Sequence, residues 1–188
     1  ILVRHEQGAS HAADGFSRAT GKPGICFATS GPGATNLITG MATAMMDSSP
    51  MIAITGQVSR PGIGKDSFQE IDITGASLPV TKHNYLVMNA SEIPQVVKEA
   101  FYIATTGRPG PVLIDIPRDV FMEEVEFDSS YWKEEIEILG YKPPKFAKNT
   151  QVDKAVKLIE KSKRPVILAG HGVIISHAYD ELLKLAES

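Results

Sequence analysis

Cysteine is almost absent from this sequence, and that scarcity limits how the fold can be stabilised. Cys26 is the only cysteine among 188 residues, so no internal disulfide can form. Disulfides are typical of secreted proteins, so a single cysteine favours a reducing compartment, and the expected location is cytoplasmic. No apolar run approaches the roughly 20 residues that a membrane-spanning helix needs. No secretory signal pattern is visible either, so we expect no membrane partner.

An excess of charge of either sign is also missing. Nineteen Lys and Arg residues nearly balance 22 Asp and Glu residues, which gives a net charge of -3. Proteins that bind nucleic acid usually carry a basic surface, so this balance argues against a nucleic-acid partner. The five histidines are scattered without metal-ligand spacing, so we predict no metal ligands in this chain.

Short β-branched runs alternate with helical patterns along the first 120 residues. The runs "GICFATS", "PMIAITG" and "PGPVLIDIP" resemble buried strands, and the opening "ILV" resembles the end of another. Such alternation predicts βαβ units, and therefore an α/β fold with an open, mostly parallel sheet and helices on both faces. The helix predicted over residues 8–21 would have one apolar face, formed by Ala9, Ala12, Ala13, Phe16 and Ala19.

The pattern changes after about residue 120. Residues 121–150 are first acidic and then basic, contain a Pro-Pro pair and show no sustained period, which predicts a surface linker. A new unit follows, with a helix, the strand "RPVILAG", the turn "HGVIIS" and another helix. We therefore predict a domain at 1–120, a linker at 121–150 and the start of a second α/β domain at 151–188. The chain begins inside an apolar run, so we expect a piece of a longer protein.

Four polar groups follow the predicted strands. They are Glu6, the turn "TSGPGATN", the segment 56–70 and "PRD" at 117–119. Ligands of open α/β sheets bind at the carboxyl ends of strands, so the shared position of these groups predicts a site there. Each also has a structural explanation, since an acid in a first helical turn is favoured by the helix dipole and glycine turns are common connections.

Glu6 is the candidate with the clearest chemistry. A carboxylate at a strand end, partly removed from water, can have a raised pKa and exchange protons near neutral pH. The glycine turn that follows opens a helix, so its free N–H groups could bind an anion or a ring nitrogen. The 56–70 segment is long and punctuated by glycine, which is typical of functional loops and also of solvated surface loops.

The motifs together resemble one enzyme family. "RHEQGASHAADGFSRATGKPG", "TSGPGATNLITGMATAMMDSSP", "ITGQV", "DSFQE", "TKHNYLV" and "GRPGPVLIDIPRDV" have the order and spacing found in acetolactate synthase catalytic subunits. The resemblance implies a thiamine-diphosphate enzyme of branched-chain amino-acid biosynthesis. The first domain would be the pyrimidine-binding domain without its first strand, followed by the start of a central, FAD-associated domain. Another thiamine-diphosphate decarboxylase or carboligase, and a non-catalytic nucleotide-binding module, are the alternatives.

The resemblance also implies a reaction and partners. Pyruvate would lose CO₂ on thiamine diphosphate and be condensed with a second 2-ketoacid, such as another pyruvate or 2-ketobutyrate. Mg²⁺ would be bound by a domain absent here, and FAD would be a further cofactor. The site would lie between two subunits, which implies a homodimer or tetramer, with a possible regulatory subunit. The fragment alone is expected to be inactive.

Individual residues match the motifs of this family. Glu6 matches the glutamate that hydrogen-bonds the aminopyrimidine nitrogen N1′ and so promotes deprotonation of the thiazolium C2 through the cofactor. Gln69 matches a residue that reaches the active site beside the thiazolium. The implied cofactor contacts are Glu6, Pro32, Asn36, Arg108, Gly170 and Gly172, the last three for FAD.

The implied substrate channel differs in part from the family pattern. Its predicted residues are Phe68, Lys82 and Arg118. Arg118 stands where many members have lysine, which keeps the charge but changes the geometry of the donor. Ser59 stands where many members have proline, and His171 separates the two glycines of the predicted FAD turn.

Overall fold

The chain folds into two compact units. The computed structural model describes residues 1–133 and 135–188, and it divides the chain into unit 1, Ile1–Lys142, and unit 2, Pro143–Ser188. Most of the predicted linker, up to Lys142, belongs to unit 1. Among the described residues, no helix combines the length and apolar character that crossing a membrane requires.

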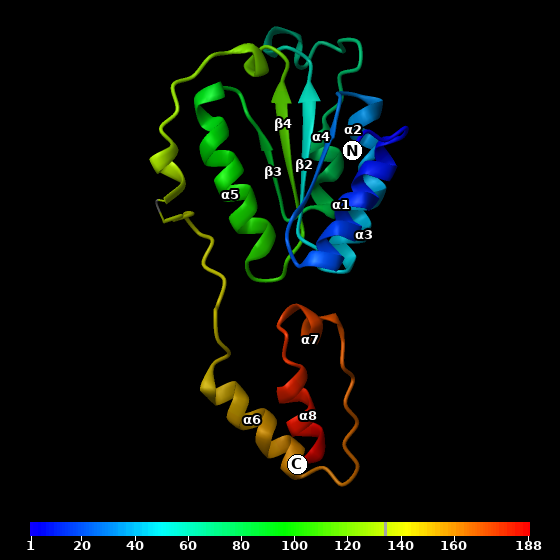
Figure 1. The fold of residues 1–188 in the computed structure, drawn as a ribbon, viewed down its shortest axis with the longest axis vertical. Helices are drawn as coiled ribbons and strands as arrows, with labels where there is room; N and C mark the ends of the chain where they lie inside the picture. The colour runs from blue at the N-terminus through cyan, green and yellow to red at the C-terminus, as the bar shows by residue number, and fades with distance from the viewer. Residues whose placement is uncertain (134) are drawn as a thin grey trace. The chain divides into compact units, whose positions relative to one another are not determined.

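Unit 1 is built around one parallel sheet. Its strands are β1 (Gly24–Ala28), β2 (Met51–Gln57), β3 (His83–Leu86) and β4 (Pro111–Pro117). They lie in the order β1-β2-β4-β3, and each neighbouring pair is parallel. The predicted α/β fold with an open parallel sheet is therefore confirmed, and the strands stand between two layers of helices (Figure 1).

Helices cover both faces of this sheet at its central strands, β2 and β4, which are buried along most of their length. The edge strand β1 is buried on one face only, since Ile25 and Phe27 are exposed. Along β2, Met51 and Ala53 belong to one hydrophobic core while Ile52 belongs to the other, as the two-residue period of a strand requires. One core includes residues of α5 (Ile93–Thr105). The opposite core includes residues of four helices: α1 (Glu6–Thr20), α2 (Pro32–Asn36), α3 (Ile38–Met46) and α4 (Ile73–Ser77).

The buried face of α1 is not the predicted one. Ala13 is buried as expected, but Phe16 is 50% exposed, and Ala12 and Ala19 are exposed as well. The helix buries polar residues in their place, namely Ser10, Asp14 and Ser17. Two of these have partners, since Ser10 donates to the Gln7 carbonyl oxygen at 3.0 Å and Asp14 pairs with Arg18 at 3.0 Å. Because short polar groups can be buried once they are hydrogen-bonded, apolar spacing alone predicted the wrong face.

Two predicted strands are not formed. Residues 1–3 are not in a strand, and Ile1 and Leu2 are fully exposed. In unit 2, residues 164–170 are extended without strand pairing, and Val166 and Leu168 are almost fully exposed. A strand needs a hydrogen-bonded neighbour, and the described part of unit 2 provides none for this segment.

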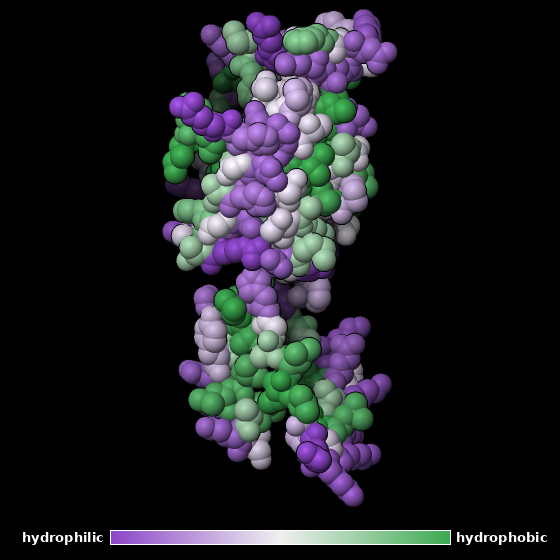
Figure 2. Space-filling view, turned by 90° about the vertical axis from the view of Figure 1, so that its right-hand side faces the viewer, coloured by the Kyte–Doolittle hydropathy of each residue, from purple (hydrophilic) through white to green (hydrophobic). Residues whose placement is uncertain are grey.

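Unit 2 consists of helices joined by extended chain. They are α6 (Asn149–Glu160), α7 (His171–Ile175) and α8 (Tyr179–Glu187). The turn predicted at 171–176 is mostly the short helix α7. Hydrophobic residues cover much of the face of unit 2 that Figure 2 shows. The exposed hydrophobic residues of unit 2 include Leu158, Leu183 and Leu185.

Close packing of α1 on β1 yields a first testable prediction. A Cβ added to Gly24 would collide with the Ala13 carbonyl oxygen and lie 2.8 Å from the Ala13 Cα. Gly24→Ala is therefore expected to lower the free energy of unfolding by about 1–3 kcal/mol, the usual cost of overpacking. Urea unfolding followed by circular dichroism measures this change.

The matched control is Gly15→Ala in the same helix, α1. Nothing lies within 4 Å of a Cβ at this position. Alanine there is expected to stabilise the protein by roughly 0.5–1 kcal/mol, because glycine is the poorer helix former. Equal effects of the two substitutions would contradict the packing described.

Candidate functional site

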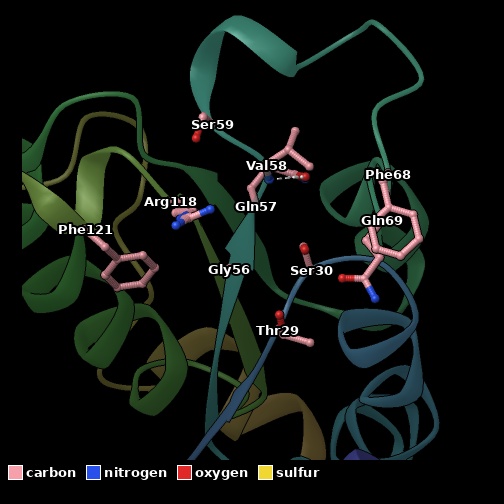
Figure 3. Close-up of a pocket in the computed structure, with 10 residues that line it drawn as sticks. All are labelled: Thr29, Ser30, Gly56, Gln57, Val58, Ser59, Phe68, Gln69, Arg118 and Phe121. Atoms are coloured by element: carbon pink, nitrogen blue, oxygen red, sulfur yellow. Dashed lines mark hydrogen bonds between the residues drawn. The ribbon is translucent and has the colours of Figure 1, made fainter.

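A cavity of about 470 Å³ lies at the carboxyl edge of the sheet, where the sequence predicts the site. Figure 3 shows its lining residues converging from three directions: the turn after β1, the end of β2 with the loop that follows it, and the segment after β4. The lining residues are Thr29, Ser30, Gly56, Gln57, Val58, Ser59, Phe68, Gln69, Arg118 and Phe121. Three of the predicted site residues, Phe68, Gln69 and Arg118, therefore surround one cavity.

Glu6 and Asn36 meet beside this cavity. The Asn36 Nδ2 donates to Glu6 Oε2 at 3.0 Å, although 30 residues separate them in the chain. This hydrogen bond is the main cause that holds the pKa of Glu6 below its usual value, and the backbone N–H of Glu6 adds to the effect. The expected raised pKa is therefore wrong, because the carboxylate is solvated and accepts hydrogen bonds that favour its charged form. Glu6 is an ionised acceptor at neutral pH.

Space beside this carboxylate depends on the glycine turn. A Cβ at Gly33 would lie 3.4 Å from Glu6 Oε1 and 2.7 Å from Cγ2 of Thr29, a lining residue of the cavity. Any larger residue at position 33 would therefore fill the space between Glu6 and the cavity. Pro32 begins α2 in the same turn, and its ring is exposed.

The same turn also touches Gln69. A Cβ at Gly31, whose φ is 64°, would lie 2.9 Å from the Gln69 Cβ, so the two backbones approach closely. Gln69 itself has a φ of 62°, a left-handed conformation that is uncommon for residues other than glycine. Such conformations are held by surrounding structure and cluster at functional sites. Glu6, Asn36, Pro32 and Gln69 are thus brought together by one turn.

The loop formed by residues 58–70 is internally hydrogen-bonded, and we refer to it as the 58–70 loop. Its last residue, Glu70, turns its carboxylate back to accept the N–H groups of Gly64 and of Ser67, the latter at 2.8 Å. The Ser67 hydroxyl donates to the Gly62 carbonyl oxygen at 2.8 Å. The loop therefore has a defined shape that presents Phe68, whose side chain is 89% exposed.

Arg60 connects this loop to the segment after β4. Its Nε donates to Asp119 Oδ2 at 2.8 Å, another guanidinium nitrogen reaches Glu123, and a third donates to the Met88 carbonyl oxygen at 3.0 Å. The Arg60 guanidinium also holds the pKa of Asp119 below its usual value. Asp119 and Glu123 are thus paired with Arg60. The exposed Arg118 lines the cavity and supplies a positive charge there.

A buried polar cluster under the cavity is the feature that sequence reasoning missed. Asp115 is 1% exposed, and it accepts from the Thr55 hydroxyl at 2.6 Å and from Gln57 Nε2 at 2.9 Å. Burial raises the pKa of Asp115 to about 6. The signal was present in "PVLIDIP", since an acid in a strand buried on both faces requires hydrogen-bonding partners nearby.

Two predicted residues lie at the opposite edge of the sheet. Lys82 precedes β3, and its ammonium group donates to the carbonyl oxygens of Ile103 and Thr106, the latter at 2.7 Å. Arg108 precedes β4, and its guanidinium donates to the Ser48 hydroxyl at 2.8 Å and to two carbonyl oxygens at the end of α3. Within unit 1 both side chains connect structural elements, away from the cavity. The fold does not bring Lys82 together with Phe68 and Arg118.

Gly170 and Gly172 lie in unit 2, at the start of α7. Nothing lies within 4 Å of a Cβ built at either glycine, so the backbone there is open to solvent. Among residues 1–133 and 135–188, no group of three or more His, Cys, Asp or Glu side chains could hold a metal ion.

Comparison with known proteins gives consistent matches over both units. Residues 1–76 match the family described as thiamine pyrophosphate enzyme, N-terminal TPP binding domain, and residues 152–188 match the thiamine pyrophosphate enzyme central domain. The probable acetolactate synthase large subunit of Methanocaldococcus jannaschii is 57% identical over 100% of this chain and 32% of its own length. The acetolactate synthase large subunits of Corynebacterium glutamicum and Mycobacterium tuberculosis are 54% and 53% identical over 100% of this chain, and 29% and 30% of their own lengths. The chain therefore spans about a third of the length of these relatives.

Burial of Asp115 predicts a pH dependence of stability. Its pKa is about 6 in the folded protein and about 3.9 in an unfolded chain. Between these values the folded state binds more protons, so the contribution of Asp115 to the free energy of unfolding falls as the pH rises from about 4 to 6. Asp115→Asn removes this contribution, and the difference between wild type and variant is expected to change by about 3 kcal/mol across the range.

Urea unfolding of both proteins at a series of pH values tests this expectation. The exposed Asp153→Asn in α6 serves as the control for the same chemical change. If the free energy of unfolding changed with pH in the same way in wild type and in Asp115→Asn, the raised pKa of Asp115 would be refuted.

Proposed function

The chain belongs to the thiamine pyrophosphate enzymes as a homologue of acetolactate synthase large subunits, and we propose that it forms the part of such an enzyme that receives the aminopyrimidine ring of the cofactor. The observation that carries this proposal is the Glu6 carboxylate, which Asn36 keeps ionised beside the cavity. Gly33 leaves space between this carboxylate and the cavity wall, so a planar ring can approach it.

Glu6 would act on the ring by hydrogen bonding and by charge. An ionised carboxylate accepts an N–H from a ring nitrogen and stabilises a positive charge there, which favours the protonated ring. A lowered pKa suits this role, because the carboxylate must stay charged while the ring carries the proton. The cofactor, when bound, supplies the carbon nucleophile and the electron sink for decarboxylation.

The other residues of the turn and loop would orient the reactants. Asn36 directs the Glu6 carboxylate, and Pro32 borders the same turn. Gln69 is held by the turn at Gly31 and is the proposed contact beside the reacting carbon. Phe68, largely exposed, offers an apolar wall that would exclude water from the reacting groups.

The proposed substrates are pyruvate and a second 2-ketoacid, pyruvate or 2-ketobutyrate. Both carry a carboxylate, and Arg118 is a cation on the cavity wall whose neighbouring acids are paired with Arg60. A guanidinium can bind a carboxylate through two parallel hydrogen bonds. We therefore propose that Arg118 guides the anionic substrates toward Gln69.

Further cofactors and partners complete the proposal. Mg²⁺ would be bound outside the described residues, and FAD would be held at Gly170 and Gly172, where the backbone is open. Arg108 would contact FAD only by giving up part of its present hydrogen bonds at the end of α3. We expect a homodimer or tetramer. We also propose a second, regulatory subunit, since the names of several relatives describe a large subunit.

Replacement of Glu6 tests the proposed function directly. In the full-length protein, Glu6→Gln is expected to lower acetolactate formation from pyruvate by at least about 100-fold, because a neutral amide cannot stabilise the protonated ring. Assays with pyruvate, 2-ketobutyrate, glyoxylate and oxalyl-CoA separate acetolactate synthesis from other carboligase activities. Glu124→Gln, at an exposed position, is the control. Near-normal turnover of the Glu6 variant would refute the assigned role.

Replacement of Arg118 tests the proposed path of the substrate. Arg118→Met is expected to raise the KM for pyruvate roughly tenfold, the scale of one charged hydrogen bond at a partly exposed site. Arg118→Lys keeps the charge and should retain part of the affinity. Steady-state kinetics measure both effects, with the exposed Arg164→Met as the control. An unchanged KM in Arg118→Met would exclude substrate binding by this side chain.

A further inference from the structure

One side chain joins both ends of the 58–70 loop. The loop leaves the sheet directly after Gln57, and the Val58 N–H donates to Gln57 Oε1 at 2.9 Å, the dashed line in Figure 3. The loop returns at Ile71, whose carbonyl oxygen accepts from Gln57 Nε2 at 2.8 Å. A single amide group therefore bridges the beginning and the end of the loop.

Asp115 determines which way this amide faces. Its carboxylate accepts from Gln57 Nε2 at 2.9 Å and from the Thr55 hydroxyl at 2.6 Å. A carboxylate has no N–H to offer, so the nitrogen of the Gln57 amide must point toward it and the oxygen must point toward Val58. All three side chains are buried, at 0% to 7% exposure. Water does not reach them, so breaking one of these hydrogen bonds leaves a buried polar group unpaired, which costs free energy.

The loop depends on this amide because its other attachments are weaker. The Arg60 side chain binds Asp119, Glu123 and the Met88 carbonyl oxygen, and its backbone N–H donates to Asp119 Oδ1 at 3.0 Å. The three side chains are about one third exposed, and ion pairs at such positions contribute little. All of these contacts hold the loop near Arg60, not at its return to Ile71. The close approach of Gly31 to Gln69 restricts the loop by packing alone, because glycine has no side chain that could form a hydrogen bond. The buried Gln57 amide is the polar connection that fixes where Ile71, and hence Gln69, stands.

We propose that Gln57, oriented by Asp115, is a positioning residue that holds the 58–70 loop in the shape that presents Phe68 and Gln69 to the cavity. A role of this loop shape in catalysis rests on the proposed function, but the effect of Gln57 on the loop does not. The competing explanation is that the cluster only stabilises the core between β2 and β4, in which case the loop would follow overall stability.

Gln57→Glu separates these explanations in the full-length protein. It keeps the shape of the side chain but replaces the amide nitrogen with an oxygen that faces Asp115 and the Ile71 carbonyl. The loop should then detach from Ile71 and open more often. Trypsin reports this opening after Lys65, which is exposed, whereas Arg60 resists trypsin because Pro61 follows it. We expect cleavage at Lys65 to accelerate about tenfold or more, since a buried acceptor loses its donor.

The double variant Gln57→Glu, Asp115→Asn provides the decisive comparison. The amide introduced on β4 can donate to the carboxylate introduced on β2, which restores the hydrogen bond between the two strands with donor and acceptor exchanged. The exchange also removes the repulsion between two carboxylates, while the Ile71 carbonyl still lacks its donor. We expect the thermal midpoint to return toward wild type while cleavage at Lys65 stays fast and kcat stays low. This variant also keeps the proposal testable if Gln57→Glu alone does not fold.

Two results would overturn the proposal. Wild-type cleavage at Lys65 in Gln57→Glu would show that the amide does not hold the loop. The second result is that, in the double variant, both the thermal midpoint and the resistance of Lys65 to trypsin return to wild-type values. The cluster would then only stabilise the core. Gln151→Glu, the same change at an exposed position of α6, is the matched control. The proteolysis result needs no activity, so an inactive wild-type protein would count against the proposed function and leave this test intact.

Discussion

The parallel pairing of β2 with β4 is the constraint on which the rest of the site depends. Their register places Thr55 opposite Asp115 and Gln57 opposite Pro117, so one strand supplies the donors and the other the acceptor of the buried cluster. The same pairing ends both strands at one edge, where the 58–70 loop and the Arg118 segment begin. The hydrogen bonds between β2 and β4 therefore determine where the segments that line the cavity leave the sheet.

Much of this arrangement could be predicted from the sequence because strong local patterns produce it. Three continuous apolar runs specify strands, and the two at the centre of the sheet, β2 and β4, are buried on both faces. Such strands pair in parallel with their carboxyl ends together. Glu6, the glycine turn, Phe68 and Gln69 then fall at one edge by topology alone. The hydrogen bond between Glu6 and Asn36 was not predicted, because Asn36 is the last residue of α2 and only the folded chain brings it to the carboxylate. The resemblance of the motifs to acetolactate synthases was the part that comparison with relatives confirmed.

Most features that could not be predicted depend on contacts between distant segments. Lys82 and Arg108 stand in motifs beside strands, but at their amino ends, and motif order does not distinguish the two edges of a sheet. The buried face of α1 was misassigned for a local reason, because Ser10 and Asp14 find partners within the helix itself, the Gln7 carbonyl oxygen and Arg18, and can therefore be buried. The segment 164–170 has strand composition, yet composition cannot supply a neighbouring strand. The pKa of Glu6 moved opposite to expectation because solvation and Asn36 outweigh burial.

The close approach of Gly31 to Gln69 has a consequence for how this site can change. A side chain at position 31 and the backbone at position 69 compete for the same volume, so neither segment can be exchanged independently. Sequence divergence in the long loop is therefore compatible with function only while the short turn stays glycine, or while both change in concert. Grafting a loop whose backbone follows a different path at position 69 would accordingly require transplanting residues 29–36 as well.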